Sequence, residues 1–496
     1  MTPVNEQMGQ LKLPFETAEE FPKAKALGAD GDSVLPSGRT GPRAVPKSNG
    51  KEGNSPSATM EEVSSRLRSA FQKVASNKGA PGPDGESVDE VRAHLDELIP
   101  KLQTALLNGT YRPGDIRRVW IPKSGGKRGL GIPNVVDRMV QEAVRQVLEP
   151  LYEPTFQAQS HGFRPNRSCH TALAEAKKHV EDGYEWVADL DLDKFFDRVH
   201  RQRLMAKLAE RVHDRQLLVL IGQMLKAKVV LPDGVVVRTD EGVPQGGPLS
   251  PLLSNIVLDE LDVELVQRGH RFVRYADDCN IYVRSERAGQ RVMTSVVGFI
   301  ERRLRLKVNL TKSAVARPEE RHFLGFRLAV VPLDGKVEVL LSKRSKERID
   351  ARIRELTPRN WGRSMRACIS QLNVYLVGWF GFFRICTAGA ERTLQFLDAH
   401  IRRRLRAIQL KHWKRRATIA RRLIRLGVRK RTAWKRVYEG RKSLWALSHD
   451  AAVERGLSNA HMAKLGLVSL AERWQAADQA VIASVQLLIG PKSVRS

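Results

Sequence analysis

This chain of 496 residues contains little cysteine. It also lacks long apolar runs and cysteine pairs with metal-binding spacing. Its four cysteines include no Cys-x-x-Cys pair, which gives no support to a zinc site, and so few cysteines also argue against a secreted disulfide scaffold. No apolar stretch reaches the length of about 18 residues that a membrane-spanning helix needs. The N-terminus lacks the apolar core of a signal peptide. We therefore expect a cytoplasmic protein in a reducing compartment, without a membrane partner.

Acidic residues are too few to balance the basic ones. The chain has 84 Lys and Arg against 55 Asp and Glu, which gives a formal net charge of +29 and a pI near 10.3. This excess disfavours a small-molecule enzyme with a neutral surface and favours a polyanionic partner, most commonly a nucleic acid. The length predicts two to four domains, and a hydrophobic content of 42% is ample for buried cores.

The N-terminal segment differs in composition from the rest. Residues 31–58 are rich in Gly, Pro and Ser and almost lack large apolar side chains, so burial cannot offset the entropy of ordering them. We predict a disordered N-terminal extension over residues 1–58, with a short recognition peptide as the alternative. From Met60 apolar residues recur at helical spacing, and helical and extended segments alternate to about residue 335.

Most of the net positive charge lies in one later region. Residues 343–442 contain 29 Lys and Arg but only six Asp and Glu. Apolar residues from Leu394 to Ile408 recur at steps of three and four, which predicts a long helix there. Solvated basic helices with tryptophans in the core would be the plain interpretation. So one-sided a charge favours nucleic-acid binding.

A pair of aspartates gives the sharpest local signal. Between residues 271 and 283, two short apolar runs flank Asp277 and Asp278, which predicts a β-hairpin with both carboxylates at its tip. An acidic turn is weak by itself, because acids are common in solvated turns. Adjacent carboxylates repel each other, however, and a bound Mg²⁺ ion relieves that repulsion.

A second acidic segment precedes the pair. Alternation from Trp186 onwards predicts a strand with Asp189, Asp191 and Asp193 on one face, although a solvent-facing strand would have the same pattern. Together with the aspartate pair, Asp191 could supply the carboxylates for two metal ions that stabilise the attacking and leaving oxygens of a nucleotidyl transfer.

These segments occur in an order that resembles the group II intron reverse transcriptase/maturase family, over roughly residues 60–475. An ordered set of this kind is far more specific than any single motif. The segments that carry the resemblance are Tyr275-Ala276-Asp277-Asp278, Asp191 to Phe196, Val243 to Pro251, the Gly-rich loop 79–85, Ile121-Pro122-Lys123 with Arg128 to Pro133, Asp137-Arg138 with Gln141, Gly162-Phe163-Arg164-Pro165, Leu304-Arg305-Leu306 with Asn309 and Lys312, Phe323-Leu324-Gly325-Phe326, and the basic region with Gly378-Trp379 and Trp413-Lys414.

The resemblance implies an α+β fold of the right-hand polymerase type. Fingers and a palm with an antiparallel sheet would occupy residues 59–335, and a basic α-helical thumb/maturase domain would follow at residues 336–445. Residues 446–496 would form a C-terminal helical segment, which could bind DNA. The chain ends before the HNH-type endonuclease of many family members and lacks paired cysteines, so we expect no second-strand nuclease.

The resemblance also assigns the catalytic and metal-binding residues. Asp191, Asp277 and Asp278 would be catalytic and would bind two Mg²⁺ ions, with the carbonyl oxygen of Leu192 as an additional ligand. The loss of any one carboxylate should collapse activity, because positioning and charge neutralisation drive this chemistry.

Further residues would bind the nucleotide. Lys123 and Arg128 would reach the triphosphate, unless they are only surface charges of the fingers. Gly129 departs from the family, which usually has proline after this arginine. Gln245 would contact the nucleotide and template, unless it is a buried structural amide. Phe196 would exclude a ribose 2′-hydroxyl and select deoxynucleotides, unless it only packs in the core.

Four residues would lie near the template and primer. Tyr275 would pack beside the primer end, with Ala276 keeping the turn small. Lys312 would contact the primer backbone or order the palm. Arg164 is expected to make a structural or backbone contact rather than to act in catalysis.

The implied partners are intron RNA, an RNA template with a DNA primer, and target DNA, in a bacterial cytoplasm or nucleoid. The long Arg-rich helices suit an RNA duplex, which proteins recognise by shape and backbone. Two alternatives stay open. One is a splicing-only maturase, against which the intact aspartates argue. The other is a stand-alone bacterial reverse transcriptase in defence or repair.

Overall fold

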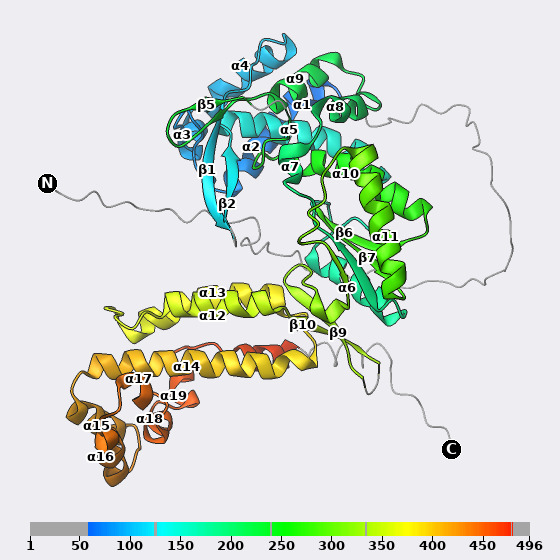
Figure 1. The fold of residues 1–496 in the computed structure, drawn as a ribbon. Coiled ribbons are helices and arrows are strands. Elements are labelled where there is room, and N and C mark those ends of the chain that lie inside the picture. Colours follow the sequence, from blue (N-terminus) through cyan, green and yellow to red (C-terminus); the bar gives the residue numbers. More distant parts are fainter. Residues whose placement is uncertain (1–57, 124–125, 239–240, 333–334, 478, 480–496) are drawn as a thin grey trace, which may run out of the picture. The chain divides into compact units, whose positions relative to one another are not determined.

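The computed structural model describes residues 58–123, 126–238, 241–332, 335–477 and 479, and these form two compact units (Figure 1). The first unit contains the described residues up to Gln157, with Asp193–Asp262 and Arg302–Lys307. The second contains Ala158–Leu192, Val263–Glu301 and the described residues from Val308 onwards. The predicted disordered extension lies, apart from residue 58, outside the described residues.

The first unit is mainly helical and begins where the sequence predicted. Helix α1 starts at Met60 because the Thr59 hydroxyl accepts a hydrogen bond from the Glu62 amide, and Ser87 with Glu90 forms a capping box at the start of α3. Its helices are α1 (Met60–Ser65), α2 (Leu67–Ser76), α3 (Val88–Ala93), α4 (Leu95–Leu107), α5 (Val135–Tyr152), α7 (Phe195–Arg198), α8 (Arg201–Ala209) and α9 (Arg215–Leu225), with the 3₁₀ turn η1 (Glu153–Thr155).

A four-stranded sheet completes the first unit. Its order is β2-β1-β4-β5, and its members are β1 (Ile116–Lys123), β2 (Gly126–Ile132), β4 (Val229–Val230) and β5 (Val236–Val237). Strands β1 and β2 form an antiparallel hairpin in which Ile121 lies opposite Arg128. The hairpin therefore carries the Ile-Pro-Lys and Arg-Gly segments on two neighbouring strands.

The second unit contains the sheet that carries the acidic segments. Its order is β6-β7-β3-β8, and every pairing within it is antiparallel. The strands are β6 (Arg271–Tyr275), β7 (Asp278–Val283), β3 (Trp186–Leu190) and β8 (Ala314–Ala316). Helix α6 (Cys169–Glu181) packs against β6, and helix α11 (Glu286–Phe299) packs against β3, β7 and β8. Helix α10 (Ser250–Gln267) and the helical turn η2 (Ile300–Leu304) contain residues of both units.

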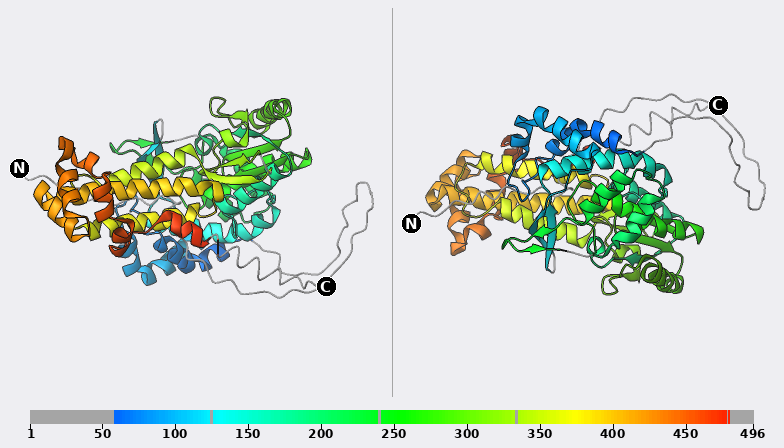
Figure 2. Two further views of the ribbon diagram at one scale, coloured as in Figure 1. Left: turned by 90° about the horizontal axis from the view of Figure 1, so that it is seen from below. Right: turned by 90° about the horizontal axis from the view of Figure 1, so that it is seen from above.

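After this sheet the chain becomes almost entirely helical. A hairpin of β9 (Phe326–Val330) and β10 (Val337–Leu341) leads into α12 (Lys343–Leu356), α13 (Met365–Phe383) and α14 (Glu391–Trp413), which lie side by side (Figures 1 and 2). Shorter helices follow: α15 (Arg416–Arg425), α16 (Lys430–Tyr438), α17 (Leu444–Leu447), α18 (Ala451–Gly456) and α19 (Asn459–Lys464). Of the 3₁₀ turns, η3 (Pro318–Glu320) precedes β9, η4 (Ala388–Ala390) lies between α13 and α14, and η5 (Glu439–Arg441) follows α16.

The long basic helix is amphipathic, as its spacing predicted. Leu394, Leu397, Ile401, Leu405 and Ile408 of α14 are all buried in one hydrophobic core, which extends from α6 through the β9–β10 hairpin to the C-terminal helices. The four tryptophans of the basic region lie partly buried against that core: Trp361, Trp379, Trp413 and Trp434. Their packing agrees with the plain interpretation of these residues and leaves part of each ring exposed.

The C-terminal helices are tied to α14 by buried polar contacts. The Asp398 carboxylate accepts hydrogen bonds from the Ser469 hydroxyl and from the amides of Leu470 and Ala471.

The predicted boundary at 335/336 lies between β9 and β10, which pair with each other. The domain boundaries stay predictions. A mixed α+β portion followed by a helical region agrees with the expected fold class, and no helix of the described chain is long and apolar enough to cross a membrane.

Candidate active site

The aspartate pair lies at the predicted hairpin. Tyr275 pairs with Asp278, so Ala276 and Asp277 form a two-residue turn, and Asp278 is the first residue of β7. Ala276 has a φ of 56°, in the left-handed region that favours glycine. A non-glycine residue keeps such a conformation when its surroundings hold it there. The hairpin is confirmed, with Asp277 in the turn itself and Asp278 directly after it.

A fully buried arginine holds this turn from behind. The Arg274 guanidinium donates to the Ala276 carbonyl oxygen at 2.9 Å and to the Ser160 hydroxyl at 2.7 Å. The backbone of Arg274 also pairs with Gln159 and His161. Gly162 approaches so closely that a Cβ atom there would lie 2.3 Å from the Ala276 nitrogen. The segment that contains Gly-Phe-Arg-Pro therefore packs directly against the aspartate turn.

Strand β3 brings Asp191 to the same end of the sheet. Leu190 lies opposite Cys279 in the antiparallel ladder, so Asp191 follows at the position next to Asp278. The expectation that Asp189, Asp191 and Asp193 share one strand face is wrong, because β3 ends at Leu190. Its partner β7 begins at Asp278, so only that residue remains beyond Cys279 and none lies opposite Leu192 or Asp193.

The other two aspartates of this segment form ion pairs with arginines. In the second unit, the Asp189 carboxylate accepts hydrogen bonds from Arg321 at 2.5 and 2.9 Å. Burial raises the pKa of Asp189, and the adjacent Arg321 cation opposes that rise. In the first unit, Asp193 pairs with Arg198 at 2.9 Å. Asp191 differs from both, because the cation beside it is a lysine at a longer distance: Nζ of Lys312 lies 3.8 Å from Oδ1 of Asp191.

The backbone of Asp191 is anchored on both sides. Its amide donates to the Ser313 hydroxyl at 2.9 Å, and its carbonyl oxygen accepts from the Asn309 amide at 2.8 Å. The Asn309 side chain closes a local turn by accepting from the amide and the hydroxyl of Thr311. Lys312 belongs to the same turn, so one short loop fixes Asp191 and supplies the cation beside it.

The donor atoms at this edge fit magnesium. Carboxylate and carbonyl oxygens are the hard ligands that Mg²⁺ prefers, and Mg²⁺ is usually held by one or two carboxylates together with substrate phosphates. Leu192 forms a β-bridge with Val308. The hydrogen bonds of this bridge use the Asp191 carbonyl and the Asp193 amide, and the Leu192 carbonyl takes no part in them. Within the described chain, no three His, Cys, Asp or Glu side chains are already arranged to hold a metal ion. The fit therefore rests on the donor chemistry and the β3–β7 register.

Two of the residues predicted to lie near the primer, Tyr275 and Arg164, belong to the hairpin and to the segment packed against it. Tyr275 is half-buried, its ring centroid lies 6.4 Å from that of the exposed Phe163, and burial raises the pKa of its hydroxyl. Arg164 donates to the Ser160 carbonyl at 2.9 Å, which is a local backbone contact. Cys279 is buried in β7, as expected of a small strand residue.

Two of the predicted nucleotide-binding side chains meet in the first unit. The Arg128 guanidinium, exposed on β2, donates from Nε to the Gln245 amide oxygen at 3.0 Å. Gln245 is half-buried, so it is not a fully buried structural amide. Lys123 is the last residue of β1 and pairs with Gly126, and its side chain lies outside the described structure. Gly129 lies within β2, where the Arg118 side chain occupies the space beside it.

The loop that carries Gln245 is fixed at several points. The Gln245 carbonyl accepts from the Gly131 amide of β2 at 2.6 Å, and the Val243 amide donates to the Phe196 carbonyl at 2.7 Å. Phe195 is buried, whereas the Phe196 ring is half-buried with its centroid 5.1 Å from that of Phe195. Core packing at this site is therefore mainly the role of Phe195.

Sequence reasoning missed the residues that support the aspartates. Arg274 was read as part of an apolar strand run, and Ser160 and Ser313 were not singled out. A charged residue inside an apolar run was the available signal, because such a residue must be paired when it is buried. Its hydrogen-bond partner, however, lies 114 residues away in the sequence.

Two family models match the chain. The model for the reverse transcriptase (RNA-dependent DNA polymerase) matches residues 121–328, and the model for the group II intron maturase-specific domain matches residues 346–426. The first match contains β3, the aspartate hairpin and the Gln245 loop. The second contains α13, α14 and α15 and most of α12.

Similar proteins include bacterial ones and proteins named for introns of yeasts. Protein YkfC of Escherichia coli K12 is 36% identical over 304 residues, which cover 53% of this chain and 80% of YkfC. The group II intron-encoded protein LtrA of Lactococcus lactis is 42% identical over 207 residues, which cover 41% of this chain and 34% of LtrA. A solved chain of a partial Cas6-RT-Cas1–Cas2 complex aligns with a TM-score of 0.33 at 24% identity, over 49% of this chain and 42% of that chain.

Proposed function

The chain belongs to the group II intron reverse transcriptase/maturase family, and on this premise we propose that it copies RNA into DNA by nucleotidyl transfer with two Mg²⁺ ions. Its reverse transcriptase domain is that of an RNA-dependent DNA polymerase, and its maturase-specific domain implies binding of intron RNA. The observation that carries the proposal is the register of β3 against β7, in which Leu190 lies opposite Cys279 and Asp191 therefore comes next to Asp278.

In this proposal Asp191, Asp277 and Asp278 hold the metal ions, and the Leu192 carbonyl contributes a further oxygen ligand. When bound, the two ions stabilise the attacking 3′-oxygen and the leaving pyrophosphate. The chain's own contribution is to fix the carboxylates before the substrate arrives. The hydrogen bonds of Asp191 to Ser313 and Asn309 support that role, as does the anchoring of the aspartate turn by Arg274.

The nucleotide is bound by cationic and polar groups of the first unit. Lys123 and Arg128 bind the triphosphate, where cationic donors match phosphate oxygens. Gln245 contacts the nucleotide and template, and its hydrogen bond to Arg128 supports a shared role for the two side chains. Phe196 excludes the ribose 2′-hydroxyl, which its partly exposed ring supports.

The remaining site residues act on the primer and template. Tyr275 and Ala276 lie beside the primer end, and Lys312 is a positioning residue that keeps a positive charge near Asp191. Arg164 acts through the backbone of the loop behind the turn. The family and the local contacts of each residue support these roles.

The basic helices bind intron RNA to assist splicing and mobility, with the template–primer duplex and target DNA as further partners. Each phosphate contact releases counterions, which makes a strongly cationic region effective for this task. The YkfC and LtrA comparisons, both from bacteria, support a place in the bacterial cytoplasm or nucleoid.

Primer extension tests the polymerase function directly. The full chain should extend oligo(dT) on poly(rA) with dTTP and Mg²⁺, and chelation of the metal with EDTA should stop extension. Asp277→Asn and Asp278→Asn should each lower the rate by about a hundredfold or more, because removal of one electrostatic stabiliser commonly costs about 10²–10³ in rate.

The Asp193→Asn variant is the matched control, because Asp193 pairs with Arg198 and is not assigned to the metal. It should retain extension close to that of the wild type. Equal extension by the wild type and the two hairpin variants, or no extension by the wild type, would contradict the proposed function.

A further inference from the structure

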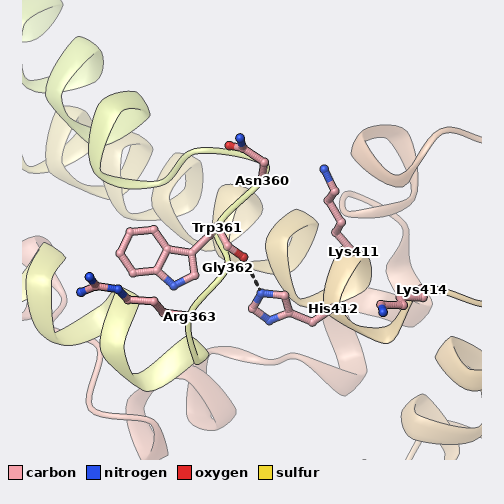
Figure 3. A pocket seen from close by; sticks show the side chains of 7 residues that line it. All are labelled: Asn360, Trp361, Gly362, Arg363, Lys411, His412 and Lys414. Carbon is pink, nitrogen blue, oxygen red and sulfur yellow. Dashed lines mark hydrogen bonds between the residues drawn. The ribbon is translucent and has the colours of Figure 1, made fainter. Parts of the chain in front are cut away.

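A cationic cavity lies within the helical region, away from the aspartates in the sequence. Its volume is about 380 Å³, within the range of about 300–1,000 Å³ that is usual for ligand sites. It opens between the loop that joins α12 to α13 and the C-terminal end of α14 (Figure 3). The lining residues are Asn360, Trp361, Gly362, Arg363, Lys411, His412 and Lys414.

The cavity wall is held in place by hydrogen bonds of Trp361. The indole Nε1 donates to the Ser364 carbonyl at 3.2 Å, and the Trp361 amide donates to the Pro358 carbonyl at 3.1 Å. The Trp361 carbonyl accepts from His412 Nε2 at 2.9 Å, which joins the loop to α14 (Figure 3). Because a carbonyl can only accept, His412 carries a proton on Nε2. The indole is thus fixed in orientation while remaining half-buried.

The charged side chains that line the cavity are Arg and Lys. Arg363, Lys411 and Lys414 are exposed, and no acidic residue lines the cavity. Figure 3 shows Trp361 and Arg363 on one side of the opening and the two lysines on the other. Lys414 follows the last residue of α14 with a φ of 59°, a conformation that non-glycine residues seldom adopt. Such backbone outliers cluster at ligand sites.

An aromatic ring beside several cations matches the chemistry of one nucleotide. Aromatic side chains stack on unpaired bases, and Lys and Arg bind the flanking phosphates. A base inside an RNA duplex cannot reach such a ring, because it is already stacked and paired. The maturase-specific match at residues 346–426 contains every residue that lines the cavity.

We propose that this cavity binds a single unpaired nucleotide of the intron RNA, with the base stacked on Trp361 and its phosphates held by Arg363, Lys411 and Lys414. This inference rests on the proposed function, since it names a feature of the RNA that the maturase region recognises. It predicts that the full chain prefers an RNA duplex with one bulged nucleotide over the same duplex without the bulge.

The test compares the two RNAs in equilibrium binding at one salt concentration. The wild type should bind the bulged RNA about tenfold more tightly, within the range that stacking of one base provides. Trp361→Ala should abolish this preference, and Trp361→Phe should keep part of it, because a smaller aromatic ring remains. Lys411→Ala should weaken binding of the bulged RNA more than binding of the duplex.

Lys430→Ala is the matched control, because Lys430 is an exposed lysine of the same region that does not line the cavity. It should weaken both RNAs equally. Melting temperatures are measured for all variants to detect a folding defect. Such a defect would also lower the affinity for both RNAs equally, in Trp361→Phe as well as in Trp361→Ala. An unchanged preference in Trp361→Ala overturns the inference, and so does the absence of any preference in the wild type.

A bulged DNA duplex separates the two nucleic acids. Equal preference for bulged DNA overturns the assignment to RNA. A wild type that binds neither RNA and does not extend primers contradicts the proposed function itself. A wild type that extends primers and binds duplex RNA, but ignores the bulge, contradicts only the inference about the cavity.

Discussion

Arg274 supports the aspartate turn without lying on its surface. The side chain is fully buried and donates to the Ala276 carbonyl, which directly precedes Asp277. A guanidinium suits this task because its donors have a fixed geometry and can bind two acceptors at once. A buried charge without partners would cost far more than its hydrogen bonds contribute. The residue therefore ties turn geometry to core stability.

Replacing Arg274 by Met should loosen the turn while retaining much of the side-chain volume. We expect primer extension to need about tenfold more Mg²⁺ for half-maximal rate, because carboxylates that are not held in place bind the metal less well. Ser160→Ala removes only one acceptor and should give a smaller shift. Titration of Mg²⁺ in the extension assay measures both. A lower rate with an unchanged Mg²⁺ requirement would contradict this role.

Phe196 offers a second prediction for a single residue. Phe196→Ala should raise incorporation of ribonucleotides relative to deoxynucleotides by about tenfold, because a bulky ring no longer excludes the 2′-hydroxyl. The control is Phe196→Tyr, which keeps the ring and should keep the selectivity. Primer extension with dTTP and UTP in parallel measures the ratio. Unchanged selectivity in Phe196→Ala would refute the assignment.

Sequence patterns identified the residues that carry chemistry more readily than those that support them. Asp277 and Asp278 were found because apolar runs flank them. Arg274 was not, because its Ser160 partner comes from a distant segment and one sequence holds no record of that proximity. The same limit applies to Ser313, whose hydroxyl caps the Asp191 amide across 122 residues.

The aspartate hairpin and the loop behind it form one rigid element. Gly162 lies where any Cβ atom would meet the Ala276 backbone, so the two segments touch main chain to main chain. The extent of β3 shows the same dependence between segments. Alternation predicted a strand to Asp193, but the strand ends at Leu190, and β7 has only Asp278 beyond its pair with Leu190. The end of a strand is set by its neighbour, which local alternation does not reveal.

Gly162→Ala tests this close contact. The added Cβ would lie 2.3 Å from the Ala276 nitrogen, so the turn must move, and primer extension should fall by about tenfold or more. The matched control is Gly222→Ala in α9, where the nearest atom to a Cβ is a flexible methyl group at 4.0 Å. It should leave extension unchanged and raise stability by about 0.5–1 kcal/mol. Full activity in Gly162→Ala would contradict the proposed positioning.

Across the whole molecule, basic residues are concentrated in the region that contains the maturase-specific match. Residues 343–442 hold 29 of the 84 Lys and Arg, and all of them follow the reverse transcriptase match in the sequence. The matched maturase domain lies inside this region. Composition predicted a polyanionic partner, and the order of motifs predicted the family. Neither could predict the cavity at Trp361, which depends on how the α12–α13 loop meets the end of α14.

Affinity for RNA should fall steeply as salt rises. If at least six phosphates are contacted, affinity should decrease by about 10³-fold or more between about 50 and 200 mM salt. Replacing Arg421, Arg422 and Arg425 of α15 by Gln should reduce the slope of log affinity against log salt by about two to three. The control replaces Lys73 and Lys101, two exposed lysines of the first unit, and should leave the slope nearly unchanged. A flat salt response of the wild type would contradict an electrostatic grip on RNA.

The order of strands in the aspartate sheet determines when the sheet can form during synthesis of the chain. Strand β3 must wait for β7, which is synthesised about 90 residues later, and β8 follows only after a further 30 or so. At a typical rate of about 5–20 residues per second, the ribosome needs roughly 5–20 s to deliver that partner. The aspartate edge therefore assembles late in the synthesis of the polymerase portion, but before most of the basic helices have left the ribosome. A nascent chain thus acquires its candidate metal site before it acquires its main means of gripping RNA.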